Sequence, residues 1–212
     1  MTKNEEVLLQ NITKALQTTS PKAEKELKLW DAAVMLPLLE TREGLSILFQ
    51  VRSMKLNWQP GDICFPGGRR EPEDENLALT AQRETEEELG LSKDDFTLLG
   101  PLDYFYTYVG PMLFPYVGVI HHPENIKIST EEVAEIFTVP IADLLKIKPR
   151  SGTITIASKP EKDFPFDVLP EYKTDWTVRK DYKVYCYNYK NRRIWGMTAR
   201  VLHSFLAKIR AL

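Results

Sequence analysis

The sequence has little cysteine, no long hydrophobic run and almost no net charge. Two cysteines among 212 residues, Cys64 and Cys186, cannot form a disulfide framework, and no C-x-x-C pair indicates a zinc site. The 28 basic and 30 acidic residues leave a net charge of −2, which argues against a strongly basic nucleic-acid-binding protein and against a net-acidic disordered chain. No apolar stretch approaches the roughly 20 residues that span a bilayer, and the opening residues lack the apolar core of a signal peptide. We therefore expect a cytoplasmic protein without nucleic-acid or membrane partners.

Acidic residues are nevertheless concentrated in one segment. Residues 71–88 carry eight carboxylates and a single basic side chain, Arg83. Within this segment, residues 77–89 are rich in strong helix formers, and Gly90 follows at the position of a C-terminal glycine cap. The pattern predicts a helix over 77–89.

Three glutamates share one face of this predicted helix. With about 100° per residue, Glu87 and Glu88 fall about −60° and +40° from Glu84, beside an apolar stripe. Such carboxylates repel one another, so either the face is solvated or a cation neutralises it. A hard divalent ion such as Mg²⁺ takes oxygen ligands and shares them with phosphate, and Arg83 could orient one carboxylate. Both the solvated face and the metal site remain open on spacing alone.

A glycine pair precedes the acidic helix. Pro66-Gly67-Gly68 follows an apolar segment, and paired glycines permit close approach of the backbone to a metal or a phosphate. By itself the tripeptide is typical of an ordinary turn. A glycine turn, a short loop and a carboxylate helix in succession favour the functional interpretation.

Elsewhere the pattern predicts one mixed α/β domain over residues 1–212, without repeats or linkers. We expect strands over 31–38, 45–51, 96–108, 114–120 and 183–189, and helices over 4–16, 22–30, 140–146 and 198–212. Residues 151–169 are not assigned. Trp195 is expected to lie in the core.

The acidic segment resembles the signature of the Nudix hydrolases: Gly, five residues, Glu, seven residues, then Arg-Glu-apolar-x-Glu-Glu-x-Gly-apolar. Residues 83–91, Arg-Glu-Thr-Glu-Glu-Glu-Leu-Gly-Leu, match the core of that signature, with Thr85 at a normally apolar position. Glu75 has the expected spacing from Arg83, but Gly68 precedes Glu75 by one residue too many. The role of Glu75 is therefore open.

The longer spacing resembles the coenzyme A diphosphatase branch of that family. This branch has an upstream motif, Leu-Leu-Thr-x-Arg-Ser, three residues, Arg, three residues, Gly, three residues, Phe-Pro-Gly-Gly. Residues 48–53 lead through Gly61 to residues 65–68 with that spacing preserved. Gln50 replaces the threonine of the motif, and Asn57 replaces its second arginine. The resemblance extends over residues 31–206 and leaves an N-terminal helical extension, residues 1–30, outside it.

The resemblance implies a Nudix-type α/β/α sandwich with a mixed central sheet. It implies hydrolysis of the diphosphate bond of coenzyme A or a derivative, a nucleotide-like small molecule, to 3′,5′-ADP and 4′-phosphopantetheine, with Mg²⁺ or Mn²⁺. The alternatives are a Nudix hydrolase acting on ADP-ribose or another nucleoside diphosphate derivative, and a non-catalytic ligand-binding module. The oligomeric state is left open, a homodimer included.

The same resemblance implies roles for individual residues. The expected metal ligands are Glu84, Glu87 and Glu88 with the Gly68 carbonyl, and these glutamates together with Arg83 form the expected catalytic set. Expected substrate-binding residues are Arg52, Ser53, Phe65 and Arg69. The general base is open: Glu84 is one candidate, and Glu131, Glu132 and Glu135 are others.

Overall fold

The structure, a computed structural model, describes residues 7, 10–14, 30–108 and 110–210. Of the predicted helix over 4–16, residues 7 and 10–14 are described and are helical. Residues 22–29 of the second predicted helix lie outside the described residues.

The described elements from residue 31 onward are mostly strands, with helices between groups of them. They are β1 (Asp31–Thr41), β2 (Gly44–Arg52), β3 (Ile63–Cys64), β4 (Gly67–Arg69), α2 (Leu77–Leu89), β5 (Phe96–Pro101), β6 (Phe105–Tyr106), β7 (Met112–Ile120), the 3₁₀ turn η2 (Pro123–Asn125), β8 (Val133–Pro140), α3 (Ile141–Lys146), β9 (Arg150–Ser158), β10 (Thr177–Tyr189), β11 (Arg192–Trp195) and α4 (Gly196–Arg210).

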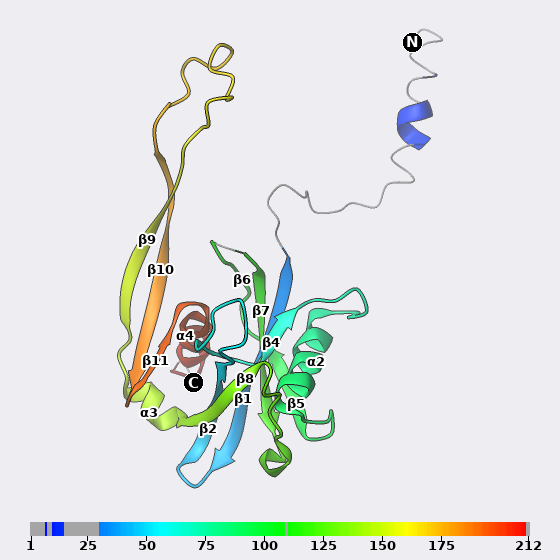
Figure 1. Ribbon diagram of the computed structural model, residues 1–212, viewed down its shortest axis with the longest axis vertical. Coiled ribbons are helices and arrows are strands. Elements are labelled where there is room, and N and C mark those ends of the chain that lie inside the picture. Colours follow the sequence, from blue (N-terminus) through cyan, green and yellow to red (C-terminus); the bar gives the residue numbers. More distant parts are fainter. Residues whose placement is uncertain (1–6, 8–9, 15–29, 109, 211–212) are drawn as a thin grey trace.

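A mixed sheet forms the centre of the protein, as predicted (Figure 1). Its main path runs β3-β2-β1-β7-β5, with β4 added beside β1, β6 beside β7 and β8 beside β2. Strands β1 and β7 are parallel, whereas β1 is antiparallel to both β2 and β4. The start of β1 therefore lies directly beside the glycine strand β4.

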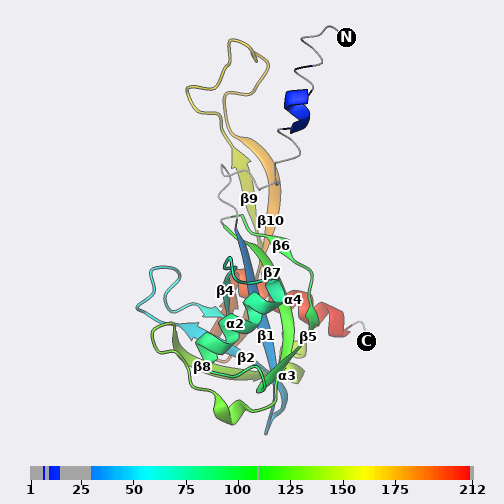
Figure 2. The ribbon, with the colours of Figure 1, turned by 90° about the vertical axis from the view of Figure 1, so that its right-hand side faces the viewer.

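Helices cover both faces of this sheet, with α2 on one side and α4 on the other (Figures 1 and 2). Side chains alternate along β1: Leu36 and Leu38 pack in the core cluster of α4, while Met35 and Leu39 pack in the cluster of α2. Because successive side chains of a strand point to opposite faces, a strand covered on both sides is apolar throughout. This explains the unbroken apolar run that predicted β1.

Helix α2 has the predicted bounds. The side-chain oxygen of Asn76 caps its N-terminus by accepting a hydrogen bond from the Leu79 amide, at 3.1 Å. Gly90 ends the helix in the left-handed conformation, with φ of 63°. Thr80, Ala81, Thr85, Glu88 and Leu89 are its buried residues, so one of the predicted carboxylates faces the protein interior.

Strands β3, β4, β8 and β11 were not predicted, and two further regions differ from the sequence prediction. The strand predicted over 96–108 is divided into β5 and β6, after an irregularity in the pairing of β5 with β7 between Leu98 and Gly100. The unassigned segment after residue 150 contains β9, which pairs with a long β10 in a separate three-stranded sheet with β11. The β9–β10 hairpin extends well beyond the central sheet (Figure 1).

None of the helices in the described part of the chain is long and apolar enough to cross a membrane.

Candidate active site

Arg83 of the acidic helix α2 forms an ion pair with Asp74 in the loop before it. Asp74 is 6% exposed, and its carboxylate accepts hydrogen bonds from Nε and Nη2 of Arg83, both at 3.1 Å. It also accepts from the Thr80 hydroxyl at 2.9 Å and the Glu71 amide at 3.0 Å. The Arg83 bond is the largest influence that lowers the pKa of Asp74, to about 2. The loop before α2 is thereby tied to the helix.

The same arginine contacts two of the predicted metal ligands. Arg83 Nη2 lies 3.0 Å from Oε1 of Glu84, and Nη1 lies 3.1 Å from Oε2 of Glu87. The Glu84 side chain is largely buried, and burial raises the pKa of its carboxyl against the lowering influence of Arg83. Glu87 is more than half exposed.

Gly68 lies against the Glu84 carboxylate. A Cβ atom at position 68 would overlap the carboxyl group of Glu84, so no residue with a side chain fits there without displacing it. Because β4 pairs with β1 through Ala33 and Gly68, the glycine backbone is held beside Glu84 of α2. The glycine in this position therefore leaves room for the close approach of the Glu84 carboxylate, and no left-handed backbone conformation requires it.

Glu88 is the most buried of the three glutamates, at 2% exposure. Its Oε2 accepts hydrogen bonds from Gln50 Nε2 at 2.8 Å and from the Gly67 amide at 3.0 Å. Burial raises the pKa of this carboxyl to about 7, although these two donors favour the charged form. The charged form is thus held in place but poorly solvated, which is a condition that a bound cation would relieve.

The donor set fits a hard divalent cation, but the side chains are not gathered into one cluster. Among the residues that the structure describes, no three His, Cys, Asp or Glu side chains are arranged to hold a metal ion. Glu84 and Glu87 form ion pairs with Arg83, whereas Glu88 accepts a hydrogen bond from Gln50. Two observations support a divalent cation here. The buried carboxyl groups of Glu84 and Glu88 have raised pKa values, and the neighbouring Gly68 has no side chain that would block access to them.

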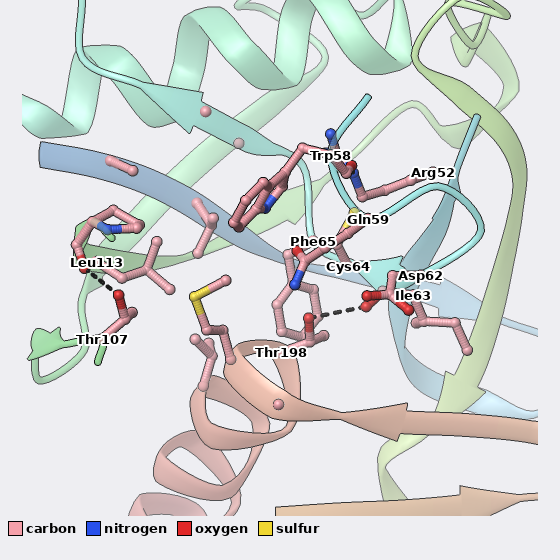
Figure 3. Close-up of a pocket in the computed structure, with 18 of the residues that line it drawn as sticks. Arg52, Trp58, Gln59, Asp62, Ile63, Cys64, Phe65, Thr107, Leu113 and Thr198 are labelled. Carbon is pink, nitrogen blue, oxygen red and sulfur yellow. Dashed lines mark hydrogen bonds between the residues drawn. The ribbon is translucent and has the colours of Figure 1, made fainter. Parts of the chain in front are cut away.

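Glu84, Glu87 and Glu88 with the Gly67–Gly68 backbone are called the acidic corner below. A cavity of about 350 Å³ opens beside the acidic corner (Figure 3). Its wall includes Gly67 and Gly68 from β4, and an aromatic set of Trp30, Trp58, Phe65, Tyr108, Tyr182 and Trp195. A largely apolar pocket with a few polar groups is typical of small-molecule sites. The cavity can therefore hold the flat or apolar part of a ligand whose polar part meets α2.

Three of the four predicted substrate-binding residues line this cavity: Arg52, Phe65 and Arg69. Arg52 Nε donates to the Trp58 carbonyl at 3.1 Å, which ties the β2–β3 loop to the guanidinium. The Arg69 guanidinium lies 5.8 Å from the centre of the Trp30 ring. Ser53 lies elsewhere: it is buried, and its hydroxyl donates to the Thr130 carbonyl at 3.4 Å.

The structure distinguishes the three downstream candidates for the general base. Glu131 forms an ion pair with Lys55 at 2.6 Å, and Glu135 forms one with Arg192. Glu132 lies near enough to the acidic helix that its charge raises the pKa of both Glu84 and Glu88. Of the three, Glu132 has the largest electrostatic influence on the pKa values of Glu84 and Glu88.

Several residues of this site were missed or misjudged in the sequence. Asp74, which was not singled out in the sequence, is the buried acid that binds Arg83, and its position six residues after Gly68 was the available signal. Trp195, expected in the core, is 45% exposed and forms part of the cavity wall. Gln50 was noted only as a departure from a motif, although it contacts Glu88 directly.

Comparison with known proteins identifies the family of the chain. A family model described as NUDIX domain matches residues 29–156. The peroxisomal coenzyme A diphosphatase ndx-8 of Caenorhabditis elegans is 35% identical over 151 residues, covering 70% of this chain and 63% of that protein.

Two mammalian proteins are also similar. The peroxisomal coenzyme A diphosphatase NUDT7 of Mus musculus is 37% identical over 109 residues, with coverage of 51% and 46% of the two chains. The mitochondrial coenzyme A diphosphatase NUDT8 of Homo sapiens is 34% identical over 125 residues, with coverage of 58% and 53%. The chain thus spans about half to two-thirds of the length of these curated relatives.

Proposed function

Because this chain belongs to the Nudix hydrolase family, whose members generally use divalent metal ions, we propose that it hydrolyses the diphosphate bond of coenzyme A or a coenzyme A derivative. The products are 3′,5′-ADP and 4′-phosphopantetheine. Three similar proteins are named as coenzyme A diphosphatases, which supports this substrate, and so does the coenzyme A diphosphatase motif around Arg52 and Gly68.

One observation carries the proposal. The Gly67–Gly68 backbone lies between a buried carboxylate corner and an aromatic cavity that arginines border. A diphosphate placed at the glycines would have the carboxylate corner on one side and the Arg52 and Arg69 guanidiniums near the cavity. Arginine forks match phosphate geometry, and aromatic walls suit the adenine ring.

In this proposal Glu84, Glu87, Glu88 and the Gly68 carbonyl hold Mg²⁺ or Mn²⁺. The ion supplies neutralisation of the diphosphate charge and a lowered pKa of bound water. Arg83 holds Glu84 and Glu87 in position, and Asp74 in turn holds Arg83. Ser53 supports the loop between β2 and β3 from its buried position.

We assign the general base to Glu132 in preference to Glu131 and Glu135. The latter two are engaged in ion pairs with Lys55 and Arg192. Glu132 is near the acidic corner, so a water between it and the diphosphate would have an acceptor for its proton. Glu84 is the alternative base within the helix.

The test is a hydrolysis assay with chromatographic separation of the products. Purified protein with coenzyme A and Mn²⁺ is expected to release 3′,5′-ADP and 4′-phosphopantetheine in equal amounts. A panel of acyl-coenzyme A, ADP-ribose and a dinucleoside diphosphate is run beside it. Absence of turnover on coenzyme A and its derivatives would overturn the proposal.

A second candidate keeps the reaction and changes the substrate. Asn57 stands at the position of the second arginine of the coenzyme A motif and is exposed in the loop beside the cavity. Loss of a phosphate contact there favours ADP-ribose or another nucleoside diphosphate derivative. Preferred turnover of a substrate without pantetheine would select this candidate, and metal binding without hydrolysis of any substrate would indicate a binding module.

Further expectations accompany the proposal. The chain acts as a single Nudix domain with an N-terminal extension, in the cytoplasm. The names of the relatives refer to the peroxisome and the mitochondrion, so localisation of the full-length tagged protein by microscopy is the measurement that decides this point.

A further inference from the structure

Gln50 lies near the C-terminal end of strand β2 (Gly44–Arg52), where the sheet meets the acidic helix. It is fully buried and pairs with Cys64 of β3 and with Ile136 of β8. Side chains alternate along the strand, so Gln50 shares a face with Leu48, which belongs to the α2 core cluster. A polar amide therefore occupies a position that the neighbouring residues fill with apolar side chains.

Both N–H groups of the Gln50 side-chain amide have an acceptor. Nε2 lies 2.8 Å from Oε2 of Glu88 and 3.5 Å from Sγ of Cys64. A side-chain amide has two N–H donors, so these two contacts determine its orientation. The opposite orientation would place two oxygen acceptors face to face at Glu88.

The carbonyl oxygen of Gln50 has no partner. Among the described residues, Oε1 of Gln50 is the one buried side-chain nitrogen or oxygen that forms no hydrogen bond. The great majority of buried polar atoms in proteins are paired, and an exception requires an explanation such as a bound water or ion. Because Oε1 and Nε2 share one carbon, this acceptor lies within a few ångström of the Glu88 carboxylate.

Glu88 shows a complementary asymmetry. Its Oε2 accepts from both Gln50 and the Gly67 amide, whereas Oε1 takes part in neither bond. The carboxylate is thereby held by one oxygen, and the other is left for a cation. The Gln50 amide and the β4 backbone together determine how this carboxylate is presented.

We propose that Gln50 is a positioning residue of the metal site, and that it has two roles. Its amino group orients Glu88, and its carbonyl oxygen accepts a hydrogen bond from a water molecule of the metal ion's coordination shell. Mg²⁺ keeps several of its waters when bound to proteins, and each of them is a hydrogen-bond donor. The inference rests on the metal-binding role assigned to Glu88 under the proposed function.

A purely structural role for Gln50 is the competing explanation, and it makes different predictions. A residue that only filled space would be replaceable by an apolar side chain without effect on the metal. A residue that oriented a ligand would not be, since loss of such outer partners typically weakens metal affinity roughly 10–100-fold.

The test is direct Mn²⁺ binding to the full chain, measured by titration calorimetry and by electron paramagnetic resonance of free Mn²⁺. Gln50→Met keeps the chain length and removes both polar atoms, and Gln50→Leu is a second apolar variant in case the first does not fold. We expect the Mn²⁺ dissociation constant to rise at least about 10-fold, on the scale of lost outer partners. Thermal unfolding of the metal-free protein is measured beside it, so that a loss of stability is distinguished from a loss of Mn²⁺ affinity.

Thr85→Val is the matched control. Thr85 is fully buried on α2, and its hydroxyl donates to the Ala81 carbonyl within the helix at 2.7 Å. This variant is expected to bind Mn²⁺ as the wild type does. Unchanged Mn²⁺ affinity in folded Gln50 variants, with or without a lower unfolding temperature, would overturn the inference. Absence of Mn²⁺ binding by the wild type would instead overturn the metal role of Glu88 in the proposed function.

Discussion

The corner around α2 and the β9–β10 hairpin are both rich in charged residues, yet their charges have different consequences. At the corner, Asp74 is 6% exposed and accepts bonds from Arg83, Thr80 and Glu71. On the hairpin side, Lys159 and Asp175 lie 3.9 Å apart with Asp175 almost fully exposed. Exposed pairs contribute little to stability because water solvates both partners, whereas a broken buried pair leaves a poorly solvated charge. The two regions therefore differ in the burial of their charged side chains, and not in how many charged residues they contain.

The largest effect is expected from Glu88→Gln. The glutamine keeps an oxygen that can accept hydrogen bonds from Gln50 and Gly67, so the fold should persist. Since the substitution removes a buried charge, we expect the unfolding temperature of the metal-free protein not to fall. Turnover of coenzyme A is expected to drop at least about 100-fold, the scale of losing one electrostatic contributor in an active site. Glu87→Gln is expected to lose activity in the same way.

Steady-state kinetics with Mn²⁺ measure this loss, and circular dichroism checks the fold. Glu86→Gln is the matched control, since it removes one charge from the same helix outside the acidic corner and should leave turnover unchanged. Retained activity in both the Glu87 and Glu88 variants would refute their metal assignment.

Asp74→Asn should have the largest effect on stability. The amide group would meet donors on Arg83 and on the Glu71 backbone, and the guanidinium would lose its most buried counter-ion, with Glu84 remaining beside it. We expect the free energy of unfolding to fall by about 3 kcal/mol, as for other broken buried pairs. Urea denaturation measures the change. Asp175→Asn on the hairpin side is the comparison, with an expected change within about 0.5 kcal/mol. Equal effects at the two sites would contradict the distinction between them.

The contribution of Asp74 should also depend on pH in a defined direction. Its pKa in the folded protein is about 2, below the ordinary value of 3.8. The folded state therefore favours the charged carboxylate, and the stabilisation is fully present above the ordinary pKa and is lost as the pH falls toward 2. Urea denaturation of wild type and Asp74→Asn between pH 5 and pH 2 should show a difference that shrinks with acidification. A difference that is constant over this range would exclude the carboxylate charge as its source.

The smallest effect is expected on the hairpin itself. Arg179 donates from Nε to the Ser158 hydroxyl and from Nη2 to the Tyr172 hydroxyl, both in exposed positions. Arg179→Ala should change the free energy of unfolding by no more than about 0.5 kcal/mol and leave coenzyme A turnover unchanged. A large loss in either measurement would show that the hairpin is coupled to the α2 corner.

Local patterns predicted what depends on local physics. Helix α2 was predicted with its bounds because its helix formers and its glycine cap act within a few residues. Strands β1 and β2 were predicted because both are apolar and close in sequence. The β9 strand was not found although Thr153, Ile154, Thr155 and Ile156 alternate polar and apolar side chains, because this run is short and proline and charged residues follow it.

In the candidate site, too, local patterns predicted some features and missed those that depend on tertiary contacts. The helical period places Glu84, Glu87 and Glu88 on one arc, but it does not distinguish the buried Glu88 from the exposed Glu87. Ser53 was chosen by its position in a motif, and the tertiary structure buries it against Thr130. Trp195 was expected in the core because tryptophan is large and apolar, yet it borders the cavity.

The sequence by itself determined the chemistry of this protein: a family signature, a carboxylate helix and a glycine pair at a set spacing. Only the tertiary structure decided which groups meet. Gln50 and Glu88 are 38 residues apart, and Gly67 reaches the same oxygen from a third element. Their contact depends on the sheet bringing β2 and β4 under α2, and so does the burial that raises the pKa of Glu88. Periodicity acts along one element, whereas burial and electrostatic coupling depend on what the other elements place around it.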